Sequence, residues 1–317
     1  MKKILFIIDK IELKYFEFNK LVTNFWLIKE LLERKCEVWI STTPQLSLKT
    51  DIAYAQCFES FLSNENIFYK KDSVCIKIDD FDLVLFRPDP PVDIDYINAT
   101  YIFDFVTKPI VLNSPRTIRD FNEKLHSVYF KEFMSENITT ACRSEIEEFL
   151  SLHKEIVLKP LNKCFGAGVM YLYAGDPNTR TIINTLTNNE TTLVMVQKYI
   201  PEVKNGDKRI LTLGDKVLKY CVKKLPNGND FKFNTHNDNF IVKAELTNKE
   251  IESFSYVAQK LDKMGIKMAG LDVIDGKIIE INVTSPCYFI KEVNTLFNTK
   301  LEKEICDFIL TPSLLSL

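Results

Sequence analysis

The stretch that decides the fold lies in the last quarter of the chain and reads Gly270-Leu271-Asp272-Val273-Ile274-Asp275-Gly276-Lys277-Ile278-Ile279-Glu280-Ile281-Asn282. Two apolar runs flank Asp275-Gly276, and this dipeptide between hydrophobic runs is a strong signal for a β-hairpin. Glu280 and Asn282 are two positions apart on the predicted second strand, so both side chains point to one face. A polar side chain inside an apolar run is costly unless it has a partner. We therefore ask what these polar groups bind.

Asp272 lies across the predicted hairpin from Glu280 and Asn282. Two carboxylates and an amide are hard oxygen ligands, the kind that Mg²⁺ with nucleotide phosphates requires. In a strict two-residue turn, however, Leu271 would face Glu280 and Asp272 would point to the opposite side of the sheet. A shared metal therefore requires a three-residue loop or a bulge that adds one residue to the register. The alternative interpretation is an ordinary hairpin with one solvated face.

Length and composition narrow the class of protein. The chain has 317 residues with 41 basic and 43 acidic side chains, a formal net charge of −2. Single cores stop growing near roughly 250–300 residues, so two or three packed subdomains are expected. The balanced charge gives no electrostatic reason to expect nucleic acid or an anionic membrane as partner. No apolar run approaches the ~20 residues of a membrane span, so we expect no membrane partner.

Glycine and cysteine usage exclude several kinds of site. Only 9 glycines occur and none precedes Gly166, which excludes a dinucleotide fingerprint or a P-loop in the first half. A nucleotide, if bound, must therefore contact the second half.

The start of the chain does not read as a signal peptide, so we expect a cytoplasmic protein with reduced thiols. The cysteines are scattered without a CxxC pair: Cys36, Cys57, Cys75, Cys142, Cys164, Cys221, Cys287 and Cys306.

The first third of the chain alternates between predicted strands and helices, which indicates a parallel α/β layer. We expect strands at Lys3–Asp9, Glu37–Ile40, Asp82–Phe86 and Pro109–Leu112, and helices at Lys20–Glu33 and near Asp93–Phe105. The Ser47–Asp80 region has too little pattern to assign.

Capping signals and alternation organise the rest of the chain. Ser114-Pro115 is typical of a helix start. Ser144 and Thr247 each begin a predicted capping box, for helices that run through Leu152 and to near Gly265. Further predicted elements are strands Glu155–Lys159, Val169–Tyr173, Leu193–Lys198, Ile210–Leu213, Val217–Lys224, Ala269–Ile274 and Lys277–Asn282, helix Thr179–Leu186, and a loop at Asn227–Asn239.

Three basic residues are candidates for contact with an anion. Lys159 ends a buried-looking strand beside the loop that contains Gly166, and such a lysine can meet a phosphate. Lys124 follows Asn122-Glu123, and Arg209 offers a planar fork suited to a carboxylate or phosphoryl group. The competing interpretation is ordinary, since most lysines are solvated and most arginines form surface ion pairs.

Taken in order, a series of segments makes nearly the whole chain resemble bacterial glutathione synthetase, a family of ATP-grasp ligases. Any one segment is weak, but their order and spacing are specific, and the run after the predicted hairpin is the strongest. The segments are Phe86–Pro91, Ala99–Ile102, Arg119–Leu125, Ile156–Leu161, Gly175–Asn178, Gly206–Arg209, Gly270–Asp272 and Glu280–Pro286.

The resemblance implies an α/β fold with two parts. Residues 1–122 would form an N-terminal parallel α/β domain that binds substrate, and residues 123–317 an ATP-grasp fold with ATP between two α+β subdomains, the lid at about 140–200. The implied reaction joins γ-glutamylcysteine and glycine through an acyl phosphate. The implied cofactors are ATP and two Mg²⁺ ions, with Mn²⁺ as a substitute, and the implied assembly is a homo-oligomer, a dimer or tetramer.

The resemblance also implies roles for individual residues, grouped by what they would contact. The phosphates would be held by Lys124 and Lys159 with Gly166 in the covering loop, and adenine by the hinge Gln197, Lys198, Tyr199 and Ile200 with Asp207 nearby. The metal ions would be bound by Asp272, Glu280 and Asn282, and the reacting groups stabilised by Arg209 and Lys232. The substrates would be held by Thr284 and Ser285, with Arg87 and Tyr101 on the peptide side.

Two loops depart from the pattern of the family. Lys163, Cys164 and Phe165 stand where the family has glycines, and Lys232 stands where it has an arginine, so the bidentate fork is lost. Ile11–Phe18 is also bulkier than expected. We therefore predict slow glutathione synthesis, with Lys232→Arg raising kcat. Two alternatives follow: an ATP-grasp ligase for a different acid and amine, and a nucleotide-binding protein without turnover.

Overall fold

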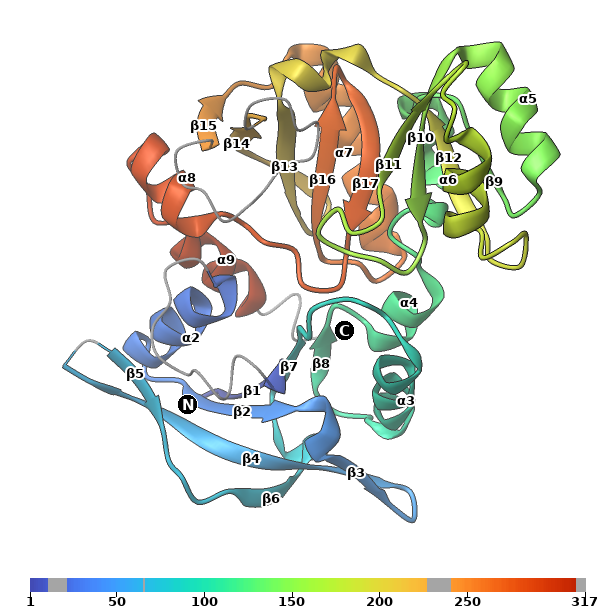
Figure 1. Ribbon diagram of the computed structural model, residues 1–317. Coiled ribbons are helices and arrows are strands. Elements are labelled where there is room, and N and C mark those ends of the chain that lie inside the picture. The colour runs from blue at the N-terminus through green and yellow to red at the C-terminus, as the bar shows by residue number, and fades with distance from the viewer. Residues whose placement is uncertain (11–21, 65, 227–240, 312–317) are drawn as a thin grey trace.

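The computed structural model describes residues 1–10, 22–64, 66–226 and 241–311 (Figure 1). Its N-terminal domain is built on four parallel neighbours, in the order β2-β1-β7-β8, and antiparallel strands extend one edge. The alternation along β1 explains the two faces, because Ile4 and Phe6 join one hydrophobic cluster while Leu5 and Ile7 join another. The strands are β1 (Lys3–Ile8), β2 (Glu37–Thr42), β3 (Leu46–Lys49), β4 (Ile52–Ser63), β5 (Asn66–Tyr69), β6 (Val74–Lys77), β7 (Leu83–Phe86) and β8 (Ile110–Leu112).

The region that the sequence left unassigned, Ser47–Asp80, forms most of the antiparallel extension. Strand β4 pairs with β2, β3, β5 and β6, so it joins the extension to the parallel core. Its buried positions include Ala53, Ala55 and Cys57, which alternate with larger, partly exposed residues. Because the buried residues are small, they give almost no hydrophobic signal, and the alternation was missed.

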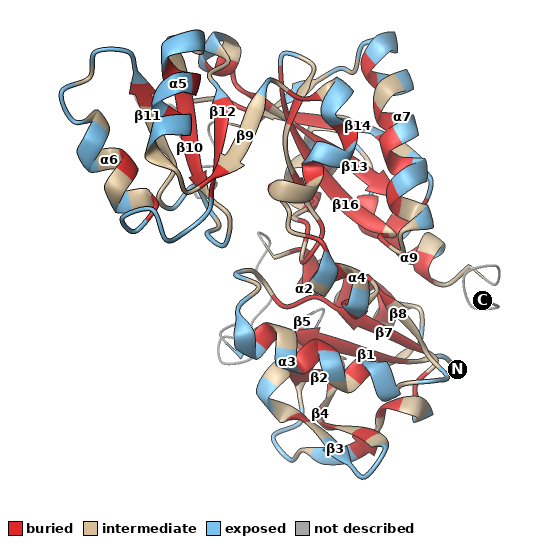
Figure 2. Ribbon diagram, turned by 90° about the vertical axis from the view of Figure 1, so that its right-hand side faces the viewer, coloured by how far each residue is buried: buried red, intermediate tan, exposed pale blue. Residues whose placement is uncertain are grey.

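Helices cover both faces of this sheet (Figure 2). The predicted starts are confirmed where they can be checked: the Ser114 side chain accepts a hydrogen bond from the Thr117 backbone N–H, and helix α3 is capped by Asp93. The helices are α2 (Thr23–Glu33), α3 (Ile94–Ile102) and α4 (Pro115–Asp120), and the short 3₁₀ turns along the chain are Thr43–Gln45, Ile78–Asp80, Phe103–Phe105, Leu125–Phe133 and Pro201–Asn205.

The second unit is a four-stranded antiparallel sheet in the order β11-β10-β12-β9. Its helix α5 corrects one prediction, because the helix begins at Arg143 and its N-cap is Cys142 rather than Ser144. The expected capping box fails because Ser144 lies inside the helix, and Glu147, its expected partner, lies 3.8 Å from Arg143 Nε instead. The elements are β9 (Asn137–Thr140), α5 (Arg143–His153), β10 (Glu155–Pro160), β11 (Met170–Tyr173), α6 (Thr179–Leu186) and β12 (Val194–Lys198).

The third unit is a five-stranded antiparallel sheet in the order β15-β14-β13-β16-β17, covered by α7. The capping box at Thr247 is confirmed: the Thr247 hydroxyl accepts from the Glu250 N–H at 3.2 Å, and Glu250 Oε2 accepts from the Thr247 N–H at 2.8 Å. The elements are β13 (Asp207–Leu213), β14 (Lys216–Lys224), β15 (Ile241–Ala244), α7 (Asn248–Lys263), β16 (Met268–Ile274) and β17 (Lys277–Asn282).

The hairpin between β16 and β17 contains the bulge that a shared metal site requires. Asp275 and Gly276 form a two-residue turn with φ of 48° and 71°. Beyond the turn the register shifts at Ile279, so Asp272 pairs with Glu280 instead of facing away from it. The bulge therefore places both carboxylates on one face, as predicted.

The chain returns to the N-terminal domain at its end. Helix α9 (Leu301–Ile309) packs against α2, α8 (Ile290–Phe297) packs against β14 and β15, and one hydrophobic cluster joins both helices to β1 (Figure 1). The domains are also fastened by Asn113, whose side chain donates to the Met268 and Val283 carbonyls at 2.7 Å each. All eight cysteines are free, and none of the described helices is both long and apolar enough to cross a membrane.

Candidate active site

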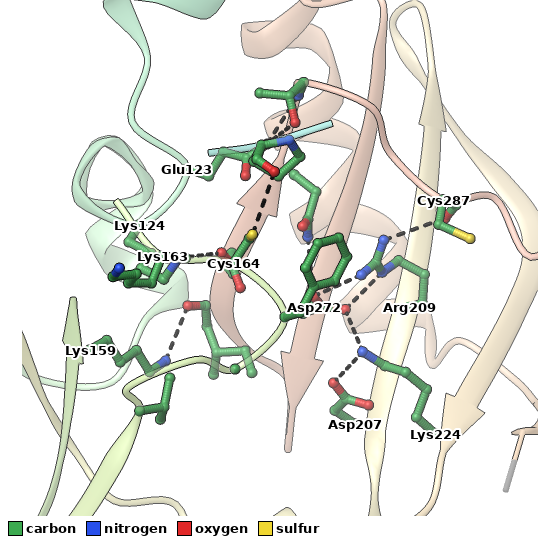
Figure 3. A pocket seen from close by; sticks show the side chains of 18 of the residues that line it. Glu123, Lys124, Lys159, Lys163, Cys164, Asp207, Arg209, Lys224, Asp272 and Cys287 are labelled. Atoms are coloured by element: carbon green, nitrogen blue, oxygen red, sulfur yellow. Dashed lines mark hydrogen bonds and ion pairs between the residues drawn. The ribbon is translucent and has the colours of Figure 1, made fainter. Parts of the chain in front are cut away.

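A cavity of about 520 Å³ lies where the three units meet. Figure 3 shows Lys124, Lys159 and Lys163 on one side and the group of Asp272, Arg209, Asp207 and Lys224 on the other. Fifteen of the residues singled out in the sequence line it: Arg87, Lys124, Lys159, Gly166, Gln197, Lys198, Tyr199, Ile200, Asp207, Arg209, Asp272, Glu280, Asn282, Thr284 and Ser285.

One described residue of the predicted site, Tyr101, is not brought to this cavity. Tyr101 is 49% exposed on α3, where the Arg119 guanidinium lies 4.5 Å from its ring centre, and it is not among the described residues lining the cavity. A helix turns about 100° per residue, so Tyr101 points about 140° away from the inward-facing Tyr96. Lys232 and the rest of the predicted 227–239 loop lie outside the described residues.

Asp272, Glu280 and Asn282 converge on one face of the hairpin. The Asn282 Nδ2 donates to Asp272 Oδ2 at 3.1 Å and to the Gly270 carbonyl at 3.2 Å, which turns its Oδ1 away from both. Within the described part of the chain, Asn282 Oδ1 and Glu280 Oε2 have no hydrogen-bond partner. No group of three His, Cys, Asp or Glu side chains among the described residues could hold a metal, so a metal here would need the amide.

Arg209 is the main partner of Asp272. Its Nε and Nη2 donate to the two carboxylate oxygens at 2.7 and 2.9 Å, a bidentate pair on neighbouring strands. The arginine lies over Gly270, where a Cβ would be only 2.8 Å from Nη1, so any larger residue would displace it. Burial acts to raise the pKa of Asp272, but Arg209 and Lys224 outweigh it and hold that pKa well below its usual range.

Lys224 is a site residue that the sequence analysis missed. Its Nζ lies 2.8 Å from Asp207 Oδ2 and 3.2 Å from Asp272 Oδ1, and all three side chains are buried. Burial raises the pKa of Asp207 to about 6 against the opposing effect of Lys224. No local signal marked Lys224, because its role depends on its pairing with Asp207 across β13 and β14. A lysine at a buried strand position next to an aspartate is expected to be paired.

The two predicted phosphate-binding lysines are both buried at the cavity. Lys124 Nζ donates to Glu280 Oε1 at 2.8 Å and to the Lys163 carbonyl at 2.7 Å. Lys159 Nζ donates to Gln197 Oε1 at 2.7 Å, and burial lowers the pKa of Lys159 to about 8. Both ammonium groups therefore point toward the bulged end of the hairpin, where phosphates beside a metal would lie.

The predicted hinge has N–H donors that are free to contact the ring of a ligand. The Lys198 and Tyr199 N–H groups already donate to the Glu136 and Glu155 carbonyls, whereas the Ile200 N–H has no acceptor among the described residues. The buried Gln197 Nε2 is likewise without a partner. Because unpaired buried donors cost about 1–3 kcal/mol, they mark a place where a ligand acceptor is expected. The hinge thus fits a nitrogen heterocycle.

The loop after β10 is not glycine-rich, yet its backbone adopts φ angles that glycine favours. Phe165 has φ of 54° and is 77% exposed, and Gly166 and Gly168 follow with φ of 71° and 72°. A left-handed conformation costs a side-chain-bearing residue roughly 1–2 kcal/mol. The loop therefore keeps the backbone path suited to glycine while presenting a phenylalanine ring and the Cys164 thiol.

Glu123 is the second residue that the sequence analysis passed over. Its Oε1 accepts from the Val283 and Thr284 N–H groups at 2.6 and 3.0 Å and from the Thr284 hydroxyl at 3.1 Å. These bonds position the loop after β17, so the Thr284 hydroxyl is already engaged while Ser285 is free to contact a ligand. Burial, with the nearby Glu280, raises the pKa of Glu123.

The arrangement of the three units is that of a known class of enzymes. The chain is similar to the solved D-cycloserine synthetase DcsG (TM-score 0.68, 11% identity, covering 97% of this chain and 99% of that one). It is also similar to a Chryseobacterium gregarium RiPP-associated ATP-grasp ligase (TM-score 0.64, 16% identity, covering 98% and 96%). At these identities the likeness establishes the fold alone, which is the ATP-grasp fold.

The sequence comparisons then give the family. The prokaryotic glutathione synthetase N-terminal domain matches residues 2–119, and the ATP-grasp domain of the same family matches residues 123–298. The chain belongs to the prokaryotic glutathione synthetase family and is an ATP-dependent ligase. Curated glutathione synthetases resemble it at 34% identity in Neisseria meningitidis serogroup A (84% of this chain, 86% of that one) and 37% in a Nostoc species (86% and 77%).

Proposed function

We propose that this chain joins γ-glutamylcysteine to glycine with ATP to form glutathione, ADP and phosphate. The observation that carries the proposal is the cavity in which Asp272, Glu280 and Asn282 face Arg209 and two buried lysines. A site with paired cations and hard oxygen donors, without an activated nucleophile, suits phosphoryl transfer by positioning and charge neutralisation. The domain boundary at residue 122 and the lid at about 140–200 belong to the same proposal.

The first step transfers the γ-phosphoryl group. A cysteinyl carboxylate oxygen forms a bond to the γ-phosphorus, the bond from that phosphorus to the β-bridging oxygen breaks, and ADP leaves. Lys124 and Lys159 would hold the phosphates, with the Ile200 N–H and Gln197 Nε2 on the adenine side. Arg209 would stabilise the negative charge that gathers on the transferred group, since a guanidinium in a buried site interacts strongly with such a charge.

The second step forms the amide bond. The glycine amine attacks the acyl carbon, the carbon–oxygen bond to phosphate breaks, and the amine loses its proton as phosphate leaves. Arg209 would stabilise the oxyanion of the tetrahedral intermediate, because Nη1 also reaches the loop after β17 through the Cys287 carbonyl at 3.4 Å. Ser285 would contact the substrates from that loop.

The donor set fits two Mg²⁺ ions, with Mn²⁺ as a substitute. Asp272, Glu280 and Asn282 supply oxygen atoms only, and Asn282 Oδ1 and Glu280 Oε2 are uncommitted within the described chain. When bound, the metal would neutralise phosphate charge. Asp272 would have to exchange part of its contact with Arg209 and Lys224 for the metal, which would release those two cations toward the phosphates.

The test is product formation from defined substrates. Purified protein with ATP, Mg²⁺, γ-glutamylcysteine and glycine is expected to release one phosphate per glutathione, with none when glycine or the dipeptide is omitted. A ligase for a different acid and amine, which the Lys163-Cys164-Phe165 substitution favours, would release phosphate only with another pair. A protein without turnover would bind ATP and release none.

Two further proposals concern the setting of the enzyme. Eight free thiols suit a reducing compartment, so we place the protein in the cytoplasm. We also propose a homo-oligomer, a dimer or tetramer, which sedimentation would measure directly.

A further inference from the structure

Phe289 lines the cavity with a backbone conformation that its side chain disfavours. It precedes helix α8 and has φ of 48° and ψ of 46°, in the left-handed region. A bulky residue is rare there, because its Cβ crowds the neighbouring carbonyl oxygen. The ring is nevertheless buried, with 6% exposed, at the wall of the cavity. Such residues persist where the surrounding structure fixes them, and they gather at functional sites.

The loop that carries Phe289 is held by two of the three units. The hydroxyl of the fully buried Tyr288 donates to the Thr212 carbonyl on β13 at 2.7 Å. The Tyr288 N–H donates to the Thr23 hydroxyl at the start of α2, at 3.2 Å. These two bonds fix the residue immediately before Phe289, so they account for the persistence of its unfavourable φ angle.

The Arg209 guanidinium lies over the Phe289 ring, with Cζ 5.6 Å from the ring centre. A cation is attracted to the face of an aromatic ring at this distance, and more strongly where water is excluded. Both side chains are buried. The other contacts of the guanidinium are the bidentate pair with Asp272 and the longer bond, 3.4 Å, from Nη1 to the Cys287 carbonyl (Figure 3). The ring therefore supports Arg209 independently of Asp272.

We propose that Phe289 is a positioning residue, whose ring holds the Arg209 guanidinium in place when Arg209 turns from Asp272 toward the reacting phosphoryl group. This inference rests on the proposed function, because it takes Arg209 to stabilise charge on that group. The attraction of a ring face for a cation does not depend on one hydrogen-bond direction, so the guanidinium can change its polar partner and keep this contact. The competing explanation is packing alone, since Phe289 belongs to a hydrophobic cluster.

The experiment changes the charge on the face of the ring while keeping its shape. A trifluorinated phenylalanine, inserted at position 289 by codon suppression, has less electron density on its face and attracts a cation less strongly. We expect kcat for phosphate release to fall about fivefold, while the KM values for ATP and glycine stay unchanged. The same replacement of Phe254, a buried residue of α7 that does not line the cavity, is the matched control and should leave kcat unchanged.

A second readout does not depend on turnover. Hydrogen exchange at the Arg209 Nε–H, measured by NMR and assigned by its loss in Arg209→Lys, reports how firmly the guanidinium is held. Phe289→Leu keeps an apolar side chain but removes the ring, so it should speed this exchange and lower kcat, each about tenfold. Unchanged exchange in both position-289 variants, or an equal fall in kcat in the Phe254 control, would overturn the assignment. If the exchange quickens but the unsubstituted protein forms no glutathione, the positioning role stands and the proposed function fails.

Discussion

The two sides of the cavity differ in whether their carboxylates are paired with a cationic side chain. On the nucleotide side, buried ions are paired: Asp272 with Arg209, and Asp207 with Lys224. On the peptide side, Asp9 Oδ2 accepts from the Asp89 N–H, and the buried Tyr96 hydroxyl has no hydrogen-bond partner among the described residues. Breaking a pair leaves a buried charge and destabilises the fold, whereas removing an uncompensated charge relieves it. The first side thus holds ions that the chain itself pairs, whereas on the second side Asp9 has no cationic partner among the described residues.

The largest expected effect is on the nucleotide side, at the hairpin. Asp272→Asn keeps volume but removes the charge that faces the metal and Arg209, so we expect glutathione formation to fall roughly 1000-fold, the worth of about 4 kcal/mol of charge stabilisation. Phosphate release measures it. Glu252→Gln, an exposed carboxylate on α7, is the control and should behave as the unsubstituted protein. Activity within tenfold of normal would remove Asp272 from the metal site.

The next largest effect is expected on the free energy of unfolding, when the ion pair of Lys224 with Asp207 is broken. Lys224→Met leaves Asp207 buried without its cation, so the free energy of unfolding should fall by about 3 kcal/mol. Urea denaturation measures this loss. Adding Asp207→Asn to Lys224→Met should recover part of it, and Lys216→Met, exposed on the same strand, should cost almost nothing. If the free-energy losses of Lys224→Met and Asp207→Asn add up to the loss of the double variant, the two side chains are not coupled as their distance indicates.

A change of opposite sign is expected on the peptide side. The pKa of Asp9 is about 6 in the fold against 3.8 without it, so the folded state binds more protons between those values and stability falls as the pH rises through that window. Asp9→Asn removes this penalty. It should therefore raise the free energy of unfolding at pH 7 by about 1 kcal/mol, allowing for the partial solvent exposure of Asp9, and by nothing below pH 3.8.

The measurement is urea denaturation of both proteins across pH 3.5 to 8. A variant that is less stable than the unsubstituted protein at pH 7 would show that Asp9 is compensated, and the contrast between the two sides would be lost.

The smallest effect is on the covering loop. Phe165→Gly fits the positive φ without strain and lets the backbone approach a phosphate, so we expect a few-fold rise in kcat with little change in stability, because the greater freedom of glycine in the unfolded chain offsets the relieved strain. Steady-state kinetics measure it. Lys232→Arg remains a parallel prediction for the loop outside the described residues. No gain from either variant would show that the altered loops do not limit the rate.

The hairpin could be predicted from the sequence because its signals are local, whereas the nucleotide roles came from the resemblance. Asp275-Gly276 marks the turn, and a shared face for Asp272 and Glu280 required either a three-residue loop or a bulge, which the structure places at Ile279. Lys224 was missed because its role depends on a pairing between strands, which its own sequence neighbours do not show.

The peptide side could not be predicted in the same way. Asp9 and Asp89 are far apart in the chain, and they meet only because β1 lies beside β7. Tyr101 was named because it lies in the Ala99–Ile102 segment that carries the resemblance, and that segment does not show that the helix turns Tyr101 away from the cavity. The antiparallel extension of the sheet was missed for a different reason. The buried residues of β4 are small, so their hydrophobicity does not stand out from that of the partly exposed residues between them.

One isotope measurement tests the central claim most directly. γ-Glutamylcysteine carrying ¹⁸O in its cysteinyl carboxylate is incubated with the protein, ATP, Mg²⁺ and glycine, and the phosphate is analysed by mass spectrometry. An acyl phosphate transfers one carboxylate oxygen, so we predict one ¹⁸O in each phosphate and glutathione that has lost one label. Unlabelled phosphate released in step with glutathione would contradict the mechanism, and labelled phosphate that forms only with another amine would contradict the substrate assignment.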